Sequence, residues 1–144
     1  MSPSAIFAPV FATMGLTFVV WTYMYVRRIH FLQSAEIPPE DLIRPGGLAA
    51  LSPAAVNNPS ENLKNLFEMP VLFYTVALVA FALDRVDGVM LFLSWVFVAF
   101  RALHSVVHCT VNIVMLRFGL YLVSSLALWG AVAWLAWSAY ATSA

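Results

Sequence analysis

The chain has 144 residues, of which 62% are hydrophobic, 15% are aromatic and only 10% are charged. A soluble domain normally carries about 25% charged residues, so these polar side chains are too few to cover a water-exposed surface. Seven Lys and Arg residues balance seven Asp and Glu residues, which excludes a basic nucleic-acid-binding surface. The high hydrophobicity also excludes a disordered chain. A small integral membrane protein remains, and its single cysteine, Cys109, is expected to be an apolar filler.

Residues 6–27 form the first predicted membrane span. A helix needs about 20 mostly apolar residues to cross the hydrocarbon, and no charge interrupts the run from Ile6 to Val26. Positive charges follow this run instead of preceding it, so it does not resemble a cleaved signal peptide.

Residues 31–58 contain prolines, glycines and charges, and such a segment cannot form one membrane helix. We expect an interfacial loop there, with a short turn of helix.

The second predicted span covers residues 59–83. Asn58 is expected to cap this helix, and Pro59 suits its first turn. Pro70 lies inside the span and is expected to kink the helix, because neighbouring groups in a membrane bundle can pair the freed carbonyl.

A polar turn at residues 84–88 leads to a third predicted span at 89–110. The fourth span is predicted at 118–140 and ends in a belt of aromatic residues, which is typical of a membrane interface. The break between these two spans is poorly marked, and we place it near residues 111–117. The predicted fold is therefore an all-α membrane protein, a four-transmembrane-helix bundle forming a single domain over residues 1–144.

Four spans place both termini on one side of the membrane. The first loop and the last turn then share the other side, which holds most of the arginines, so the positive-inside rule makes that side cytoplasmic and both termini non-cytoplasmic. A simple positive-inside role is accordingly one reading of Arg117. The arginines on the cytoplasmic side are Arg27, Arg28, Arg44 and Arg117, whereas Arg85 is alone on the opposite side.

Two of the predicted spans carry ionisable residues. Such a group costs about 2.5–3.5 kcal/mol on insertion scales, so each one is a candidate for a functional site. In both spans the polar positions recur at helical spacing and share one face, so we expect the two polar faces to meet each other or a neighbouring subunit. The second-span residues are Asn58, Glu61, Asn62, Asn65 and Glu68, with Lys64 at their edge, and the third-span residues are Arg101, His104, Ser105, His108 and Asn112.

Glu68 and Arg101 are predicted to form a buried ion pair. Glu68 lies about 14 Å into its span at 1.5 Å per residue, and Arg101 has a similar depth. An unpaired partner would cost several kcal/mol. The favoured role for this pair is structural, because polar contacts hold membrane helices together without any chemistry.

Two histidines one turn apart, His104 and His108, are candidate metal ligands. They lack a clear third ligand, so hydrogen bonding is the favoured role for them.

The run from Asn65 to Tyr74 resembles the second-helix motif of the MAPEG family (membrane-associated proteins in eicosanoid and glutathione metabolism), which is Asn-x-x-Glu followed shortly by Pro. Arg101, His104, His108 and Arg117 are similar in spacing to the family's third-helix region, where an Arg, an aromatic residue or His, a Tyr and an Arg recur. Length and span number agree over nearly the whole chain. The resemblance implies a left-handed four-helix bundle, a homotrimer, and a divergent bacterial member in the inner membrane.

The resemblance also implies that glutathione binds between subunits near the cytoplasmic face. Asn65 and Glu68 would bind its polar groups, with Glu68 taking the amino end. Arg117 would be the catalytic residue, because a guanidinium lowers the pKa of a thiol and the thiolate is the nucleophile. The other binding residues that the resemblance implies are Lys64, Arg101, His104 and His108, the last standing where the family often has a tyrosine.

Glu61 departs from the family pattern, in which glutathione-using members usually carry an Arg at this position. A carboxylate there would repel the carboxylates of glutathione, and Lys64 offsets this negative charge only as a point charge.

We rank three functions. The first is a glutathione-dependent transferase or peroxidase that acts on small lipophilic electrophiles from the bilayer. The second is a non-catalytic MAPEG-fold binding or accessory subunit of a membrane complex, and the third is a metal site built on His104, His108 and Glu68.

Overall fold

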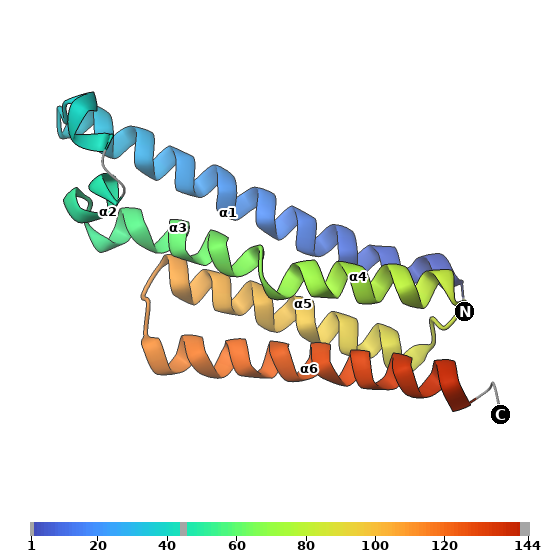
Figure 1. The fold of residues 1–144 in the computed structure, drawn as a ribbon. Helices are drawn as coiled ribbons and strands as arrows, with labels where there is room; N and C mark the ends of the chain where they lie inside the picture. Colours follow the sequence, from blue (N-terminus) through green and yellow to red (C-terminus); the bar gives the residue numbers. More distant parts are fainter. Residues whose placement is uncertain (1, 44–45, 142–144) are drawn as a thin grey trace.

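The computed structural model describes residues 2–43 and 46–141 as an almost entirely helical chain (Figure 1). Within those residues, four helical segments are long and apolar enough to cross a membrane, which agrees with the predicted all-α fold of four spans. The first of these segments begins, and the last one ends, at the same end of the molecule (Figure 1). The four segments are Pro3–Ser34, Ala54–Ala82, Gly88–Cys109 and Val114–Ala141.

The first span is longer than predicted. A short 3-10 helix η1 (Pro3–Ile6) leads into α1 (Phe7–Ser34), which continues well past residue 27. No proline or glycine interrupts the chain here, and long basic side chains such as Arg28 can extend along an apolar helix surface while their charge reaches polar surroundings. The predicted start of the loop at residue 31 is therefore wrong. Arg44, which the charge-bias prediction includes, lies outside the described residues.

The loop after α1 contains two short helices, η2 (Pro39–Leu42) and α2 (Gly47–Leu51), in agreement with the expected turn of helix. The side chain of Asn57 anchors the end of this loop. Its Nδ2 donates hydrogen bonds to the carbonyl oxygens of Ala49, at 2.9 Å, and Ser52, at 3.1 Å. These bonds hold the loop against the next helix.

That next helix, α3 (Ala54–Leu66), begins before the predicted start at residue 59. Pro53 is extended and precedes the helix, and the alanine after it is a strong helix former. Pro59 consequently lies inside α3 and not at its first position, and Asn58 is not a cap, so both of these predictions are wrong. The helix tolerates Pro59 because the unpaired carbonyl lies only one turn upstream, near the helix start.

Pro70 interrupts the second span more strongly than a kink does. α3 ends at Leu66, and α4 (Met69–Ala82) begins after two intervening residues, with Pro70 in its first turn. Between them Glu68 has φ −99° and ψ −93°, outside the helical region. A proline ring clashes with the carbonyl four residues earlier and disfavours helical backbone just before it. The predicted single helix over 59–83 is therefore two helices with a break at Phe67 and Glu68.

The third span is α5 (Gly88–Cys109), and the fourth is α6 (Val114–Ala141). Their connection covers residues 110–113, earlier than the predicted break at 111–117. Asn112 makes this tight turn possible because it has φ +47°, a left-handed conformation that asparagine tolerates better than most residues. Arg117 consequently belongs to the first turns of α6 rather than to a loop.

α5 is the central helix of the bundle, because it packs against α6, α3 and α1 (Figure 1). The apolar core includes Phe73 of α4 and Phe97 of α5, both buried, with ring centroids 4.7 Å apart. Further along α5, towards the 110–113 turn, its buried positions become polar. The apolar half of the bundle thus fixes the helices, and the other half holds polar side chains between them.

Asp87 connects the start of α5 to α6, which gives a test of this packing. Its carboxylate accepts one hydrogen bond from the backbone N–H of Met90 and another from Nε1 of Trp134, each at 2.8 Å. We expect Asp87→Ala to lower the free energy of unfolding by about 2 kcal/mol, since it removes a helix cap and leaves an indole donor unpaired. Asp87→Asn should lower the free energy of unfolding by less. Unfolding in detergent measures both, and a double-mutant cycle with Trp134→Phe that shows no coupling would contradict this role.

Candidate functional site

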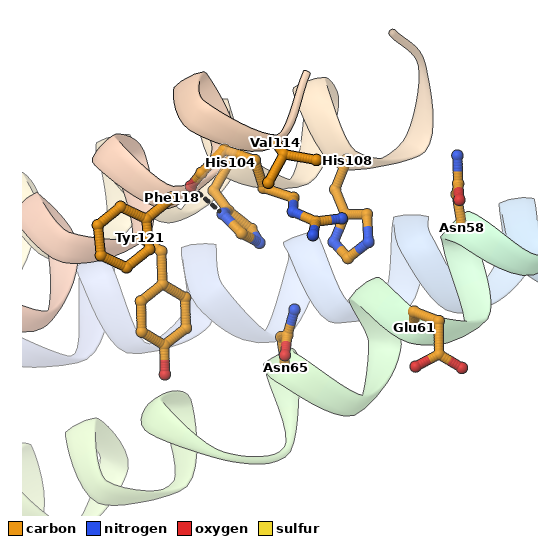
Figure 2. Close-up of a pocket in the computed structure, with 9 residues that line it drawn as sticks. Asn58, Glu61, Asn65, His104, His108, Val114, Phe118 and Tyr121 are labelled. Atoms are coloured by element: carbon orange, nitrogen blue, oxygen red, sulfur yellow. Dashed lines mark hydrogen bonds between the residues drawn. The ribbon is translucent and has the colours of Figure 1, made fainter. Parts of the chain in front are cut away.

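A polar cleft lies at the loop end of the bundle, between α3, α5 and α6 (Figure 2). Its volume is about 460 Å³, within the range of small-molecule sites, about 300–1,000 Å³. The side chains of α3 form one wall, and the histidines of α5 and residues of α6 lie opposite (Figure 2). The lining residues are Asn58, Glu61, Asn65, His104, His108, Val114, Arg117, Phe118 and Tyr121.

The α5 wall consists of the polar residues that the sequence placed on one face. Arg101, His104, Ser105 and His108 are all buried, none more than 4% exposed. Their spacing of three and four residues puts them on one side of a helix, and α3 and α6 cover that side. The expectation that this face turns away from lipid is confirmed.

The polar faces of α3 and α5 meet directly, as predicted. Ser105 Oγ donates a hydrogen bond to Oδ1 of the buried Asn62 at 3.3 Å. Asn62 Nδ2 in turn donates to Sγ of Cys109 at 3.5 Å. Cys109 is therefore a hydrogen-bond acceptor as well as a space-filling residue, which corrects the reading as a plain apolar filler.

A chain of side-chain hydrogen bonds runs across the mouth of the cleft and holds Arg117. Arg117 Nη1 donates to Oδ1 of Asn112 at 2.6 Å, and Asn112 Nδ2 donates to Oδ1 of Asn58 at 3.1 Å. The side-chain amide of Asn112 thereby connects the start of α6 to α3. The guanidinium of Arg117, half-buried at the cleft, is held by this contact.

Aromatic rings pack around His104 at the inner part of the cleft. The ring centroid of His104 lies 5.5 Å from that of His108 and 5.7 Å from that of Tyr121. His104 Nδ1 is 2.9 Å from the backbone oxygen of Arg117, whereas His104 Nε2 and His108 Nδ1 are buried without a hydrogen-bond partner. Two nitrogen atoms beside this cleft thus have no hydrogen-bond partner among the described residues.

Sequence reasoning did not select Tyr121. It lies on α6, four residues after Arg117, so the two side chains share one helix face. That spacing was visible in the sequence, but a tyrosine in an apolar span carries no charge that marks it as unusual. Its position against His104 depends on how α6 packs on α5, which helical spacing alone does not reveal.

The predicted ion pair between Glu68 and Arg101 is wrong. Arg101 is 0% exposed, and its guanidinium carbon lies 4.6 Å from the ring centroid of Tyr121, a cation–π contact. None of its guanidinium nitrogens has a hydrogen-bond partner within residues 2–43 and 46–141. Glu68 is exposed and makes no ion pair with Arg101, because the break before Pro70 ends the helical register that aligned it with Asn65.

Glu68 and Lys64 line a different opening, which we call the α1–α3 groove. It has a volume of about 510 Å³. Arg28 Nη2 donates to Ser60 Oγ there at 2.8 Å, and Lys64 Nζ lies 2.7 Å from Glu61 Oε1. The groove residues are Met24, Arg28, Ser60, Leu63, Lys64, Phe67 and Glu68.

The structure separates the predicted site residues into three places. Lys64 and Glu68 line the groove, and Arg101 lies beneath Tyr121. The residues that line the polar cleft are Asn65, His104, His108 and Arg117.

The metal-site reading finds no support in this geometry. Residues 2–43 and 46–141 contain no group of three His, Cys, Asp or Glu side chains that could hold a metal ion. His104 and His108 are neighbours, but Glu68, their proposed third ligand, lines the α1–α3 groove instead.

Comparison with known proteins agrees with the fold. The model of the MAPEG family matches residues 6–137, nearly the whole chain. The protein belongs to the MAPEG family. Members of this family generally use glutathione and are usually trimeric. No curated protein and no solved structure matched the chain.

Asn112 is the residue whose replacement tests the geometry of this MAPEG cleft. Asn112→Ala removes two side-chain hydrogen bonds, each worth about 1 kcal/mol, and puts alanine at a left-handed backbone position. We expect the free energy of unfolding in detergent to fall by about 2–3 kcal/mol. Asn112→Gly keeps the backbone conformation and should lose less, and Asn112→Asp keeps the acceptor for Arg117. Equal stability of the Ala, Gly and wild-type proteins would contradict this role.

Proposed function

We propose that this protein is a glutathione-dependent transferase or peroxidase that acts on lipophilic electrophiles. The observation that carries the proposal is the polar cleft, in which the half-buried guanidinium of Arg117 lies with buried histidine nitrogens that have no hydrogen-bond partner among the described residues. A cation next to a thiol favours the thiolate, which is the nucleophile in such reactions. Family membership supports the same assignment.

The residues of the cleft fit the chemistry of glutathione. The tripeptide offers carboxylates, amides, an ammonium group and a thiol. Arg117 matches an anion, the side-chain amides of Asn58 and Asn65 match the peptide groups, and Glu61 matches the ammonium group. The resemblance assigned the ammonium to Glu68, but Glu61 is the carboxylate that lines this cleft, so we assign it that role. Glutathione supplies the reacting group, which is its thiol.

The cleft is open to an apolar second substrate on its α6 side. Val114 and Phe118 line it, and they are 60% and 58% exposed in the single subunit. In a bilayer, apolar side chains exposed on a transmembrane helix face either lipid or a neighbouring subunit. A lipophilic electrophile dissolved in the membrane therefore has an apolar route to Arg117, while glutathione enters from the aqueous end.

The proposal includes a homotrimer. Glu68 supports it, because this carboxylate is exposed within a membrane-spanning segment of the single subunit. Ionisable side chains at that position almost always face protein or a water-filled cavity, so a neighbouring subunit would cover the α1–α3 groove. The arginine-rich end would face the cytoplasm, with both termini on the other side.

A second candidate function is a non-catalytic MAPEG-fold binding or accessory subunit. Glu61 favours it, because a carboxylate on the wall of the cleft repels the carboxylates of glutathione. Its ion pair with Lys64 neutralises that charge in part, but both side chains are more than half exposed, so the pair is weak. Binding of glutathione at millimolar concentration separates the two functions.

The proposed function is tested by conjugation of glutathione to a chromogenic aryl halide with detergent-purified protein. We expect Arg117→Ala to lower kcat/KM by about 100-fold or more, because charge stabilisation in a catalytic site is worth several kcal/mol. Arg27→Ala is the matched control, since Arg27 contacts the Tyr23 ring outside the cleft, with its guanidinium carbon 6.0 Å from the ring centroid. That control should keep wild-type activity.

The opposite result is equally clear. If the wild-type protein binds no glutathione at millimolar concentration while its mass in detergent corresponds to an intact trimer, the transferase is ruled out and the accessory function is favoured. Activity that is unchanged in Arg117→Ala would remove this arginine from the mechanism.

A further inference from the structure

The hydrogen bond between His104 and the backbone of Arg117 determines where the imidazole carries its proton. Nδ1 of His104 lies 2.9 Å from the carbonyl oxygen of Arg117 (Figure 2). A carbonyl oxygen only accepts hydrogen bonds, so Nδ1 must be the donor and must carry the hydrogen. In the neutral ring the lone pair is then on Nε2. The backbone of α6 thereby fixes one tautomer of a histidine on α5.

The nitrogen with that lone pair has no hydrogen-bond partner in the part of the chain that the structure describes. Nε2 of His104 is buried and makes no hydrogen bond, and the whole residue is only 2% exposed. A buried acceptor left without a donor costs about 1–3 kcal/mol, which a ligand with a donor group recovers. Because His104 lines the polar cleft, the donor would belong to a molecule bound there.

We propose that His104 is the general base that takes the thiol proton of the bound substrate. This inference rests on the proposed function. The S–H bond breaks, its proton moves to Nε2, and the sulfur keeps the electron pair as a thiolate, which Arg117 stabilises. The thiolate then attacks the electrophilic carbon of an aryl halide, the halide leaves, and the imidazolium returns its proton to water through the open end of the cleft.

The arrangement has the three parts that an activated nucleophile needs: a base, a group that orients the base, and a cation for the product anion. One residue supplies two of them, since Arg117 orients the ring through its carbonyl and stabilises the thiolate through its guanidinium. His108 is less suited to be the base, because no hydrogen bond fixes its tautomer in this structure. The titratable and charged groups around His104 are Arg101 and His108 on α5, Arg117 and Tyr121 on α6, and Glu61 across the cleft on α3.

The decisive experiment is the pH profile of conjugation by His104→Gln. Glutamine keeps an N–H donor for the Arg117 carbonyl but cannot take a proton. We expect kcat at neutral pH to fall by about 100-fold, at the lower end of general-base effects, with little change in KM for glutathione. The loss should shrink as the pH rises above the ordinary thiol pKa of about 8.5, because the thiol then ionises in water. His30→Gln, a histidine on α1 outside the cleft, is the matched control with a wild-type profile.

Two measurements keep the inference independent of the folding and turnover of that variant. Ultraviolet absorbance of bound glutathione should show a thiolate in the wild-type protein at neutral pH and not in His104→Gln. The ¹⁵N spectrum of histidine-labelled wild-type protein should show the Nδ1–H tautomer at His104.

An equal loss in His104→Gln at every pH, an unchanged thiolate signal, or the Nε2–H tautomer would each overturn the base while leaving the transferase intact. A wild-type protein that neither binds nor conjugates glutathione would overturn the proposed function, and the base with it. The two failures are therefore distinguishable.

Discussion

The hydrocarbon core contains no water, so polar side chains in a membrane bundle must find their partners within the protein. In this chain that constraint is met by the contacts of α3 with α5 and with the turn that leads into α6. Asn62 bonds to Ser105 at 3.3 Å, and Asn112 bonds to Asn58 at 3.1 Å. These bonds join three helices at one end of the bundle, and the polar cleft lies between those helices.

The same constraint makes the unpaired groups informative. The guanidinium of Arg101 lies against the ring of Tyr121. Its nitrogens, like His104 Nε2 and His108 Nδ1, are buried without a hydrogen-bond partner among the described residues. Each unpaired group costs free energy in the single subunit. Such unpaired groups at one end of the bundle, while the other half is an apolar core, support the proposal that a molecule binds in the polar cleft. Glutathione chemistry, which members of the MAPEG family generally use, is consistent with such a site.

α3 has polar side chains on two sides, because its polar residues are spaced around the helix and because the helix ends at Leu66. One side lines the polar cleft, and Lys64 on the other side lines the α1–α3 groove. The break at Phe67 then takes Glu68 out of the cleft and leaves Glu61 as its carboxylate. Charge in this site is therefore arranged differently from the arrangement that the family motif alone implies, with an acid on one wall and Arg117 on the other.

Composition and helical spacing were enough to predict four spans, an all-α bundle, polar faces of the second and third spans that meet, and a MAPEG resemblance that the family comparison confirms. These features follow from local rules: the length of apolar runs and the 3.6-residue period. The pairing of Glu68 with Arg101 was predicted wrongly because it assumed one continuous helix, and a proline changes register by an amount that sequence does not reveal. The contact of Tyr121 with His104, and the carbonyl that fixes the His104 tautomer, depend on how α6 packs against α5. Only the tertiary structure determines such contacts, because they join residues whose separation along the chain carries no information about their distance in space.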